Sequence, residues 1–481
     1  MKIRLLFLII ALTLCAPGNA QAPEKLSSSD IYHEIEKLNF LGTVLYLAAH
    51  PDDENTRMIS YFSNEVHART AYLSITRGDG GQNLIGPEIR ELLGVIRTNE
   101  LVRARQTDGG EQFFTRANDF GYSKHPDETL EIWKKEKVLN DVVRVMREFQ
   151  PDIIINRFDA ESAGRTHGHH TSSAMLSLEA FDLAPDEDYD TPGFSAWEPK
   201  RIFFNTHWWF YGSREKFEEV DKSKMLSVDI GTYYNGKGLS NSEIASLSRS
   251  MHKSQGFGST GTRGSEMEYL QLLKGTMPKE KSDIFEGINT TWSRVKGGQA
   301  IQKILEQVQE DYDFENPAKS VPALMQAYEL IVQLENKHWR EFKTQQIKDI
   351  IAACLGLYLE GVSAEPYSTL GDQLDIEVEA INRSPVDIEL KSVWVLPMQK
   401  EQKMGKDLPF NTGFKEKMTV QLPDNLGPTS PYWLDKPWSL GMYDVDDQAM
   451  IGEPVTPRSL RLQFNMEIDG QEVSFERDVV Y

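Results

Sequence analysis

The chain has 481 residues and carries a formal net charge of −21. Its length suits about two or three domains with a sizeable core. The excess of negative charge would repel phosphate backbones, so the composition disfavours binding to nucleic acid.

The first 20 residues have the layout of a secretory signal peptide. Lys2 and Arg4 precede an apolar run at residues 5–14, and small residues then lead to Ala20. This layout predicts cleavage after Ala20 and a secreted or periplasmic protein. The mature chain would keep a single cysteine, Cys354. No later apolar run approaches the ~18 residues that a transmembrane segment requires.

From about residue 38 to residue 290 the chain alternates between short β-rich runs and amphipathic helical stretches. The predicted strands are residues 43–49, 70–76, 152–156 and 201–206, and the clearest predicted helix is residues 136–150. Apolar strands separated by helices are typical of an α/β fold. We therefore predict a Rossmann-like, mostly parallel sheet with helices on both faces.

The rest of the chain has two other periodicities. Apolar residues at helical spacing, such as Ile301 and Leu305, predict a helical segment at residues 291–361. Beyond it, apolar and polar residues alternate from Leu374 onward, which predicts an antiparallel β-sandwich-like domain at residues 366–481. We expect this last domain to be separable and to carry none of the chemistry.

The sequence "AHPDDE" at residues 49–54 follows the first predicted strand. His50 therefore lies at the carboxyl end of that strand, where open α/β sheets bind their ligands. Pro51 and the acidic residues after it would also suit the first turn of a helix, because proline and negative charge are favourable there. That alternative leaves His50 without a role.

A second polar cluster, "RTHGHH" at residues 165–170, follows the predicted strand at 152–156. It holds three of the ten histidines, a composition typical of metal sites. His167 and His170 are spaced to share one face of a helical turn, whereas His169 would point elsewhere. One histidine and one carboxylate from the first loop, with one histidine from the second, would leave a position open for water, as in catalytic zinc sites.

Together these motifs resemble the PIG-L (LmbE-like) family of zinc-dependent N-deacetylases, which remove acetyl groups from N-acetylglucosamine-containing molecules. The similarity spans about residues 38–290 and includes "TRGDGG" at residues 76–81, the helix around Glu100 and "HKSQ" at residues 252–255. The resemblance implies a deacetylase domain at residues 27–290.

The resemblance also implies roles that the spacing leaves open. By similarity to the family, His50, Asp53 and His170 bind Zn²⁺, and another divalent metal would suit the same ligands. The same similarity makes Asp52 the general base and His167 the group that stabilises the oxyanion.

Three further residues are expected near this site. His169 stands where the family often has aspartate. We expect it to support the metal ligands without binding the metal itself. Arg77 and Asp79 follow the predicted strand at 70–76. We expect them to line the substrate pocket, and an exposed loop is the alternative.

The sequence therefore predicts a secreted, zinc-dependent N-deacetylase whose partner is an acetylated amino sugar or glycan. A non-haem Fe(II) oxygenase is one alternative, because His50-Pro51-Asp52 with a distant histidine also matches the H-x-D…H facial triad. A non-catalytic glycan-binding protein with the same fold is another. The sequence identifies neither the acetylated substrate nor the oligomeric state.

Overall fold

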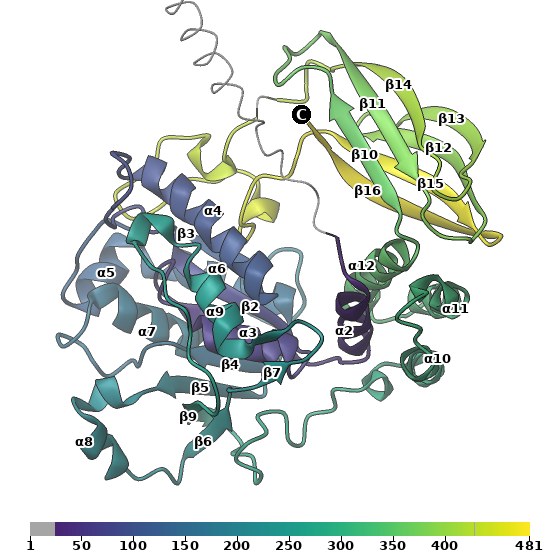
Figure 1. Ribbon diagram of the computed structural model, residues 1–481. Coiled ribbons are helices and arrows are strands. Elements are labelled where there is room, and N and C mark those ends of the chain that lie inside the picture. The colour runs from purple at the N-terminus through teal and green to yellow at the C-terminus, as the bar shows by residue number, and fades with distance from the viewer. Residues whose placement is uncertain (1–24, 428) are drawn as a thin grey trace, which may run out of the picture.

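The computed structural model describes residues 25–427 and 429–481 and shows an α/β domain, a group of helices and a β-rich domain (Figure 1). The predicted signal peptide, residues 1–20, lies outside the described residues. None of the described helices combines the length and the apolar character that a membrane-spanning helix needs.

The α/β domain is built on a mostly parallel sheet with the strand order β3-β2-β1-β4-β5-β9-β6. Its strands are β1 (Thr43–Ala48), β2 (Arg69–Thr76), β3 (Glu111–Ala117), β4 (Ile153–Asn156), β5 (Arg201–Thr206), β6 (Met225–Asp229) and β9 (Met267–Gly275). Strands β1 to β5 pair in parallel, whereas β9 runs antiparallel to both β5 and β6. The strands predicted from the sequence are confirmed as β1, β2, β4 and β5.

Helices cover both faces of this sheet, as predicted (Figure 1). The helices of this domain are α3 (Thr56–Asn64), α4 (Glu91–Asp108), α5 (Pro126–Ile132), α6 (Lys135–Phe149), α7 (Gly168–Leu183), α8 (Arg214–Glu218) and α9 (Asn241–Arg249). Leu45 of β1 shares one core with Val142 of α6. Val44 and Tyr46 share the opposite core with Met58 of α3. Because side chains alternate along a strand, the fully buried β1 needs a helical layer on each side.

The predicted helical segment contains α10 (Gly298–Glu310), α11 (Val321–Ile331) and α12 (Lys337–Cys354). The N-terminal helix α2 (Ser28–Leu38) packs with this group. Its residues Ile31 and Ile35 share one buried core with Ile301 and Ile347. Helix α2 therefore links the start of the α/β domain to the helices that follow it.

The C-terminal β-rich domain has the strand order β13-β12-β15-β16-β10-β11-β14. Its strands are β10 (Tyr358–Ser363), β11 (Gln373–Ile381), β12 (Ile388–Leu396), β13 (Lys400–Asp407), β14 (Phe414–Gln421), β15 (Arg461–Ile468) and β16 (Gln471–Val480). Strands β10 and β16 pair in parallel, and the other neighbours are antiparallel. Val378 of β11 and Phe464 of β15 lie in one core, so the sheet curls around its interior. The prediction of an antiparallel, sandwich-like domain is confirmed.

Shorter elements complete the described chain. They are the hairpin of β7 (Tyr233–Tyr234) with β8 (Leu239–Ser240), and the 3-10 turns η1 (Trp208–Tyr211), η2 (Lys253–Gln255), η3 (Trp292–Arg294), η4 (Pro317–Ser320), η5 (Tyr432–Leu434) and η6 (Gln448–Met450). Two of these turns, η5 and η6, belong to the long connection between β14 and β15.

That connection, residues 429–460, leaves the β-rich domain and packs on the α/β domain. Met442 forms an antiparallel bridge with Ala117 of β3, and the Phe114 N–H donates to the Gly452 carbonyl at 3.1 Å. The yellow-green chain near β3 and α4 in Figure 1 belongs to this connection. It covers the edge strand of the parallel sheet, which would otherwise be free to pair. Removal of the C-terminal domain would uncover this edge, so these contacts count against the expectation that the domain is separable.

Arg77, directly after β2, anchors the connection. The residue is 1% exposed. Its guanidinium donates to the carbonyls of Pro454 at 2.8 Å and Glu453 at 3.1 Å, and to the Tyr432 hydroxyl at 2.9 Å. It also lies 3.5 Å from the ring centre of Trp433. A cation held by carbonyls and an aromatic face ties the connection to the sheet.

We predict that Arg77→Met lowers the free energy of unfolding by about 2–4 kcal/mol, because it leaves buried acceptors without a donor. Urea unfolding of the full chain measures the change. Arg458→Met is the matched control, since Arg458 is exposed and its loss should change stability little. Equal stability of the two variants would contradict the anchoring role.

Candidate metal centre

The parallel pairing of β1 with β4 brings the two polar clusters together. In this pairing Leu47 lies opposite Asn156, close to the carboxyl end of each strand. The loop after β1 carries His50, and the loop after β4 leads into α7. Both loops therefore meet at one edge of the sheet, as the sequence predicted.

The acidic residues after β1 do not belong to a helix. Helix α3 begins at Thr56, and the Asn55 side chain caps it by accepting from the Arg57 N–H at 3.2 Å. The first turn of α3 contains no acidic residue. The alternative that Pro51 and its acidic neighbours start a helix is therefore wrong, and their carboxylates are available to the site.

Asp53 lies between two histidines. Its Oδ2 accepts from the backbone N–H of His50 at 2.8 Å and lies 3.0 Å from His50 Nδ1. Its Oδ1 lies 3.5 Å from His170 Nε2. Burial opposes ionisation, but His170 and His50 outweigh it and hold the pKa of the Asp53 carboxyl well below its usual range. Asp53 is thus an ionised carboxylate between two imidazoles.

His170 is oriented by an aromatic neighbour. Its ring stacks on Phe158, with centroids 3.8 Å apart and an interplanar angle of 4°. The side chain of His170 remains 23% exposed. His50, Asp53 and His170 offer ligand atoms that all lie within 4.8 Å of one another.

The helical spacing expected for His167, His169 and His170 requires His167 to be part of α7, but the helix starts one residue later. His167 is the N-cap, with a ψ of 137°, and Gly168 is the first helical residue. The angular spacing of a helix therefore does not apply to His167, and His169 does not point elsewhere. Its ring centroid lies 5.2 Å from that of His50, and the centroids of His167 and His170 each lie 5.3 Å from it. The expected orientation of His169 is wrong.

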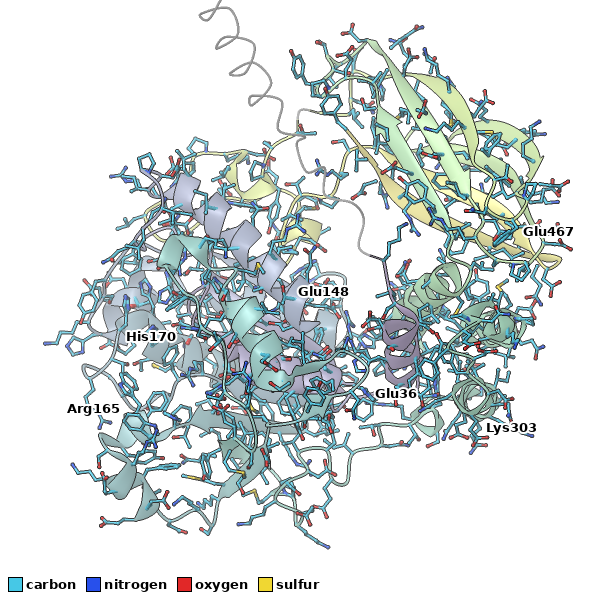
Figure 2. All side chains as sticks on the ribbon, in the orientation of Figure 1. Glu36, Glu148, Arg165, His170, Lys303 and Glu467 are labelled. Carbon is cyan, nitrogen blue, oxygen red and sulfur yellow. The ribbon has the colours of Figure 1, made fainter. Side chains whose placement is uncertain are left out.

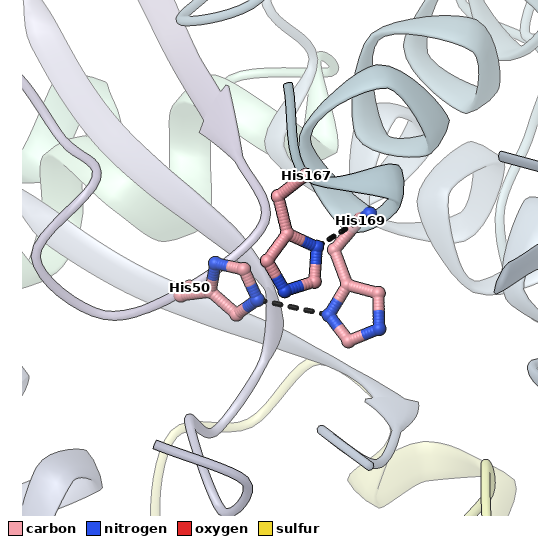
Figure 3. Close-up of side chains that lie close together, drawn as sticks. All are labelled: His50, His167 and His169. Atoms are coloured by element: carbon pink, nitrogen blue, oxygen red, sulfur yellow. Dashed lines mark hydrogen bonds between the residues drawn. The ribbon is translucent and has the colours of Figure 1, made fainter. Parts of the chain in front are cut away.

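His167 caps α7 with its side chain. Its Nδ1 accepts from the His169 N–H at 3.1 Å, as the dashed line in Figure 3 shows. Burial, with His50 and His170 nearby, lowers the pKa of His167 to about 4. The ring is therefore neutral at pH 7 and carries its proton on Nε2, because Nδ1 is used as an acceptor. Nε2 is left as a hydrogen-bond donor.

His169 supports His50 from inside the protein. Its Nδ1 lies 2.9 Å from His50 Nε2, a contact drawn in Figure 3. The ring is fully buried, with centroids 4.5 Å from Phe120 and 4.6 Å from Trp133. Burial, followed by the neighbouring imidazoles, strongly lowers the pKa of His169, so the ring is neutral. With His169 Nδ1 as the acceptor, His50 Nε2 carries the proton, and His50 Nδ1, which lies 3.0 Å from Asp53 Oδ2, is the nitrogen left to bind a metal.

Asp52 has different partners from Asp53. Its φ of 88° is a backbone conformation that residues with a side chain seldom adopt. Its carboxylate lies 3.3 Å from the Arg97 guanidinium. Burial raises the pKa of Asp52 to about 6, although Arg97 opposes the effect. Neighbouring aspartates thus take up separate positions and ionise differently.

The helix around Glu100 and residues 252–255, which are also part of the family resemblance, hold the loop after β1 in place. Buried His252 lies 2.7 Å from Glu54 Oε1, and Glu54 Oε2 accepts from the Asp52 N–H at 2.8 Å. Glu100 accepts from the backbone N–H of Ser254 at 2.6 Å and from its hydroxyl at 2.7 Å. Segments far apart in the chain therefore fix the backbone around Asp52.

Arg77 and Asp79 are both buried, 1% and 2% exposed, and contact residues 429–460. The Tyr443 hydroxyl donates to Asp79 Oδ1, and Asp79 Oδ2 accepts from the Asp119 N–H at 3.4 Å. Burial raises the pKa of Asp79 to about 7. Both residues therefore link the end of β2 to the C-terminal connection inside the protein.

The loop after β3 adds residues that the sequence analysis missed, because β3 itself was not predicted. Asp119 lies 4.0 Å from His50 Nε2 and 3.8 Å from His169 Nδ1. Tyr122, in the same loop, is 75% exposed, and its ring centroid lies 5.0 Å from that of His167. The short apolar run at residues 113–114, five residues before Asp119, was the available signal.

The donor chemistry fits a zinc ion. Two imidazoles and a carboxylate, from His50, His170 and Asp53, are ligands that zinc prefers, and three protein ligands leave a position for water. A second group, His50 with His167 and His169, also has its ligand atoms within 4.8 Å. This group suits the ion less well, because it contains no carboxylate and because His169 is fully buried.

Residues 45–181 match the family model described as PIG-L: GlcNAc-PI de-N-acetylase. This part of the chain is a PIG-L family domain. The match begins in β1 and ends in α7, so it contains both polar clusters. The resemblance is confirmed over these residues. No curated protein matches the sequence.

Two solved structures are similar to the chain over part of its length. One is the N,N'-diacetylchitobiose deacetylase from Pyrococcus horikoshii in complex with its inhibitor MPG, with a TM-score of 0.32, 17% identity, and coverage of 44% of this chain and 70% of that one. The other is GalB, the 4-carboxy-2-hydroxymuconate hydratase from Pseudomonas putida KT2440, with a TM-score of 0.33, 17% identity, and coverage of 50% and 99%.

We predict that His169→Leu lowers zinc affinity by ~10–100-fold, the usual effect of losing a residue that orients a metal ligand. His169→Asn should retain most of the affinity, because its side-chain oxygen still accepts from His50. Competition with a chromophoric chelator measures both constants. Unchanged affinity in His169→Leu would contradict the supporting role.

Proposed function

We propose that this protein is an exported, zinc-dependent N-deacetylase that acts on an N-acetylglucosamine-type amino sugar or glycan. The observation that carries the proposal is the Asp53 carboxylate between His50 and His170, with Asp52 held apart from them by Arg97. The match of residues 45–181 to a de-N-acetylase family supports the reaction type. The layout of residues 1–20 supports export.

His50, Asp53 and His170 would hold the zinc ion. When bound, zinc polarises a water molecule and lowers its pKa to near ~7. The contact of His169 with His50, and the stacking of Phe158 on His170, restrict the two imidazoles to this arrangement. The ligands are therefore preorganised by their neighbours.

Asp52 is the general base of the proposed reaction. Its carboxylate accepts a proton from the water that attacks the amide carbonyl and passes a proton to the amine nitrogen as the C–N bond breaks. Partial burial beside Arg97 keeps the carboxylate close to the site without making it a metal ligand. A base with a pKa near neutrality is well suited to this two-way transfer.

His167 is the proposed oxyanion donor. Its Nδ1 is occupied by the cap of α7, so Nε2–H is the group that can donate to the carbonyl oxygen as negative charge develops there. Exposed Tyr122 lies beside His167. Its ring offers an apolar face on which a sugar can stack.

The facial-triad alternative has less support. It requires Asp52 as the carboxylate ligand, but Asp53 is the aspartate that lies close to both His50 and His170. Asp52 is paired with Arg97. The geometry therefore favours the ligand set of a zinc hydrolase over the H-x-D…H set of an Fe(II) oxygenase.

Acetate release from N-acetylglucosamine, its oligomers and acetylated glycolipids tests the function. The expected result is release that a chelator abolishes and that added zinc restores. Release that survives complete removal of metal would contradict metal dependence. Binding of these sugars without release in the zinc-loaded protein would instead identify a glycan-binding protein.

We predict that Asp52→Asn retains its metal and lowers turnover by ~10²–10⁴-fold, because an amide cannot accept the proton of the attacking water. Metal analysis and acetate release on the same preparation measure both properties. Asp53→Asn is the matched comparison and should lose the metal. If Asp52→Asn loses the metal instead, the roles of the two aspartates are reversed.

A further inference from the structure

A separate group of candidate metal ligands lies where α2 meets the turn before β2. His33 and Glu36 are one turn apart on this helix, and His67 follows α3 in the turn that leads to β2. Their ligand atoms all lie within 4.8 Å of one another. Figure 2 labels Glu36 on α2 and His170 in a different part of the α/β domain. This group is therefore separate from the candidate metal centre.

The three side chains approach one another without bonding. Glu36 Oε2 lies 3.7 Å from His33 Nδ1 and 3.8 Å from His67 Nε2. Both distances exceed a normal hydrogen bond. Ligand atoms around a tetrahedral zinc ion lie about 3.4 Å apart, given bonds of about 2.0–2.2 Å. The spacing is thus close to that of ligands around one ion and too wide for direct contact.

The backbone and the burial also suit a binding site. His67 has a φ of 62°, a left-handed conformation, and its ring centroid lies 4.9 Å from that of His33 on α2. The side chains are largely buried, with exposures of 11% for His33, 27% for Glu36 and 23% for His67. Buried His33 Nε2 has no hydrogen-bond partner among the described residues. A charged carboxylate and two imidazoles in such a place gain from a shared cation.

The geometry points to a second divalent-metal site, in which His33, Glu36 and His67 bind one zinc ion. Two imidazole nitrogens and a carboxylate oxygen are donors that zinc accepts, and three protein ligands leave a position for water. The residues line a cavity of ≈ 610 Å³ that is open to solvent on one side, which provides that water and a path of entry.

The charges around the cavity favour a cation. Glu65 lies on its wall and adds a carboxylate close to Glu36. Two lysines close to the group are already paired: Lys37 with Glu34 at 3.0 Å and Lys237, on the cavity wall, with Asp30 at 3.1 Å. Neither ammonium group is left to neutralise Glu36.

An ion here would tie two parts of the protein together. Helix α2 shares its core with α10–α12, whereas His67 belongs to the α/β domain between α3 and β2. A metal bound to both would restrain the N-terminal helix against the sheet domain. Metal that binds the folded state would raise its stability by mass action.

Zinc content of the full mature chain, dialysed against a small excess of zinc and measured by elemental analysis, tests the site. The wild-type protein should contain two zinc equivalents. Glu36→Gln and His67→Gln should each contain one, and His170→Ala should also contain one. Zinc should raise the melting temperature of His170→Ala but not that of a His170→Ala/His67→Gln double variant.

Glu310→Gln is the control, because Glu310 is an exposed carboxylate at the end of α10 and lies outside the group. It should keep two equivalents. Circular dichroism of the metal-free variants verifies that they fold. A wild-type protein with one equivalent that His170→Ala abolishes would overturn the second site. Unchanged zinc content in folded Glu36→Gln and His67→Gln would overturn it as well.

Discussion

The parallel pairing of β1 with β4 is the constraint on which the candidate centre depends. It sets the ends of two strands side by side although their loops are more than a hundred residues apart in the chain. Neither segment alone holds all three candidate ligands, because His50 and Asp53 lie in the loop after β1 and His170 lies in the first turn of α7. The buried faces of both strands, packed on helices, keep this register from slipping.

Within that frame, each buried charge near the centre has a specific partner. Asp53 lies between His50 and His170, Asp52 beside Arg97, and Glu54 against His252. Buried carboxylates without partners would be costly, so these pairs hold the loop in one conformation. The separation of Asp52 from Asp53 follows from this pairing, and it allows adjacent aspartates to have different chemical roles.

Buried polar contacts also join the C-terminal connection to the α/β domain. Arg77 and Asp79 leave β2 and bond to residues 432–454, and Asp79 in turn contacts the backbone of Asp119. Asp119 lies 4.0 Å from His50 Nε2. A continuous set of buried polar contacts therefore runs from the C-terminal part of the chain to the centre, which gives the β-rich domain a structural bearing on the site.

The sequence by itself determined the strands β1, β2, β4 and β5 and the helices on both faces of the sheet. It also determined the polar clusters around His50 and His167. These features follow from apolar periodicity and composition, which are local properties of the chain. It did not determine the start of α7, the contact of His169 with His50, the burial of Arg77 and Asp79, or the approach of residues 429–460 to β3. Those features depend on which segments meet in space. A cap, a register and a buried partner are decided only when distant parts of the chain pack together.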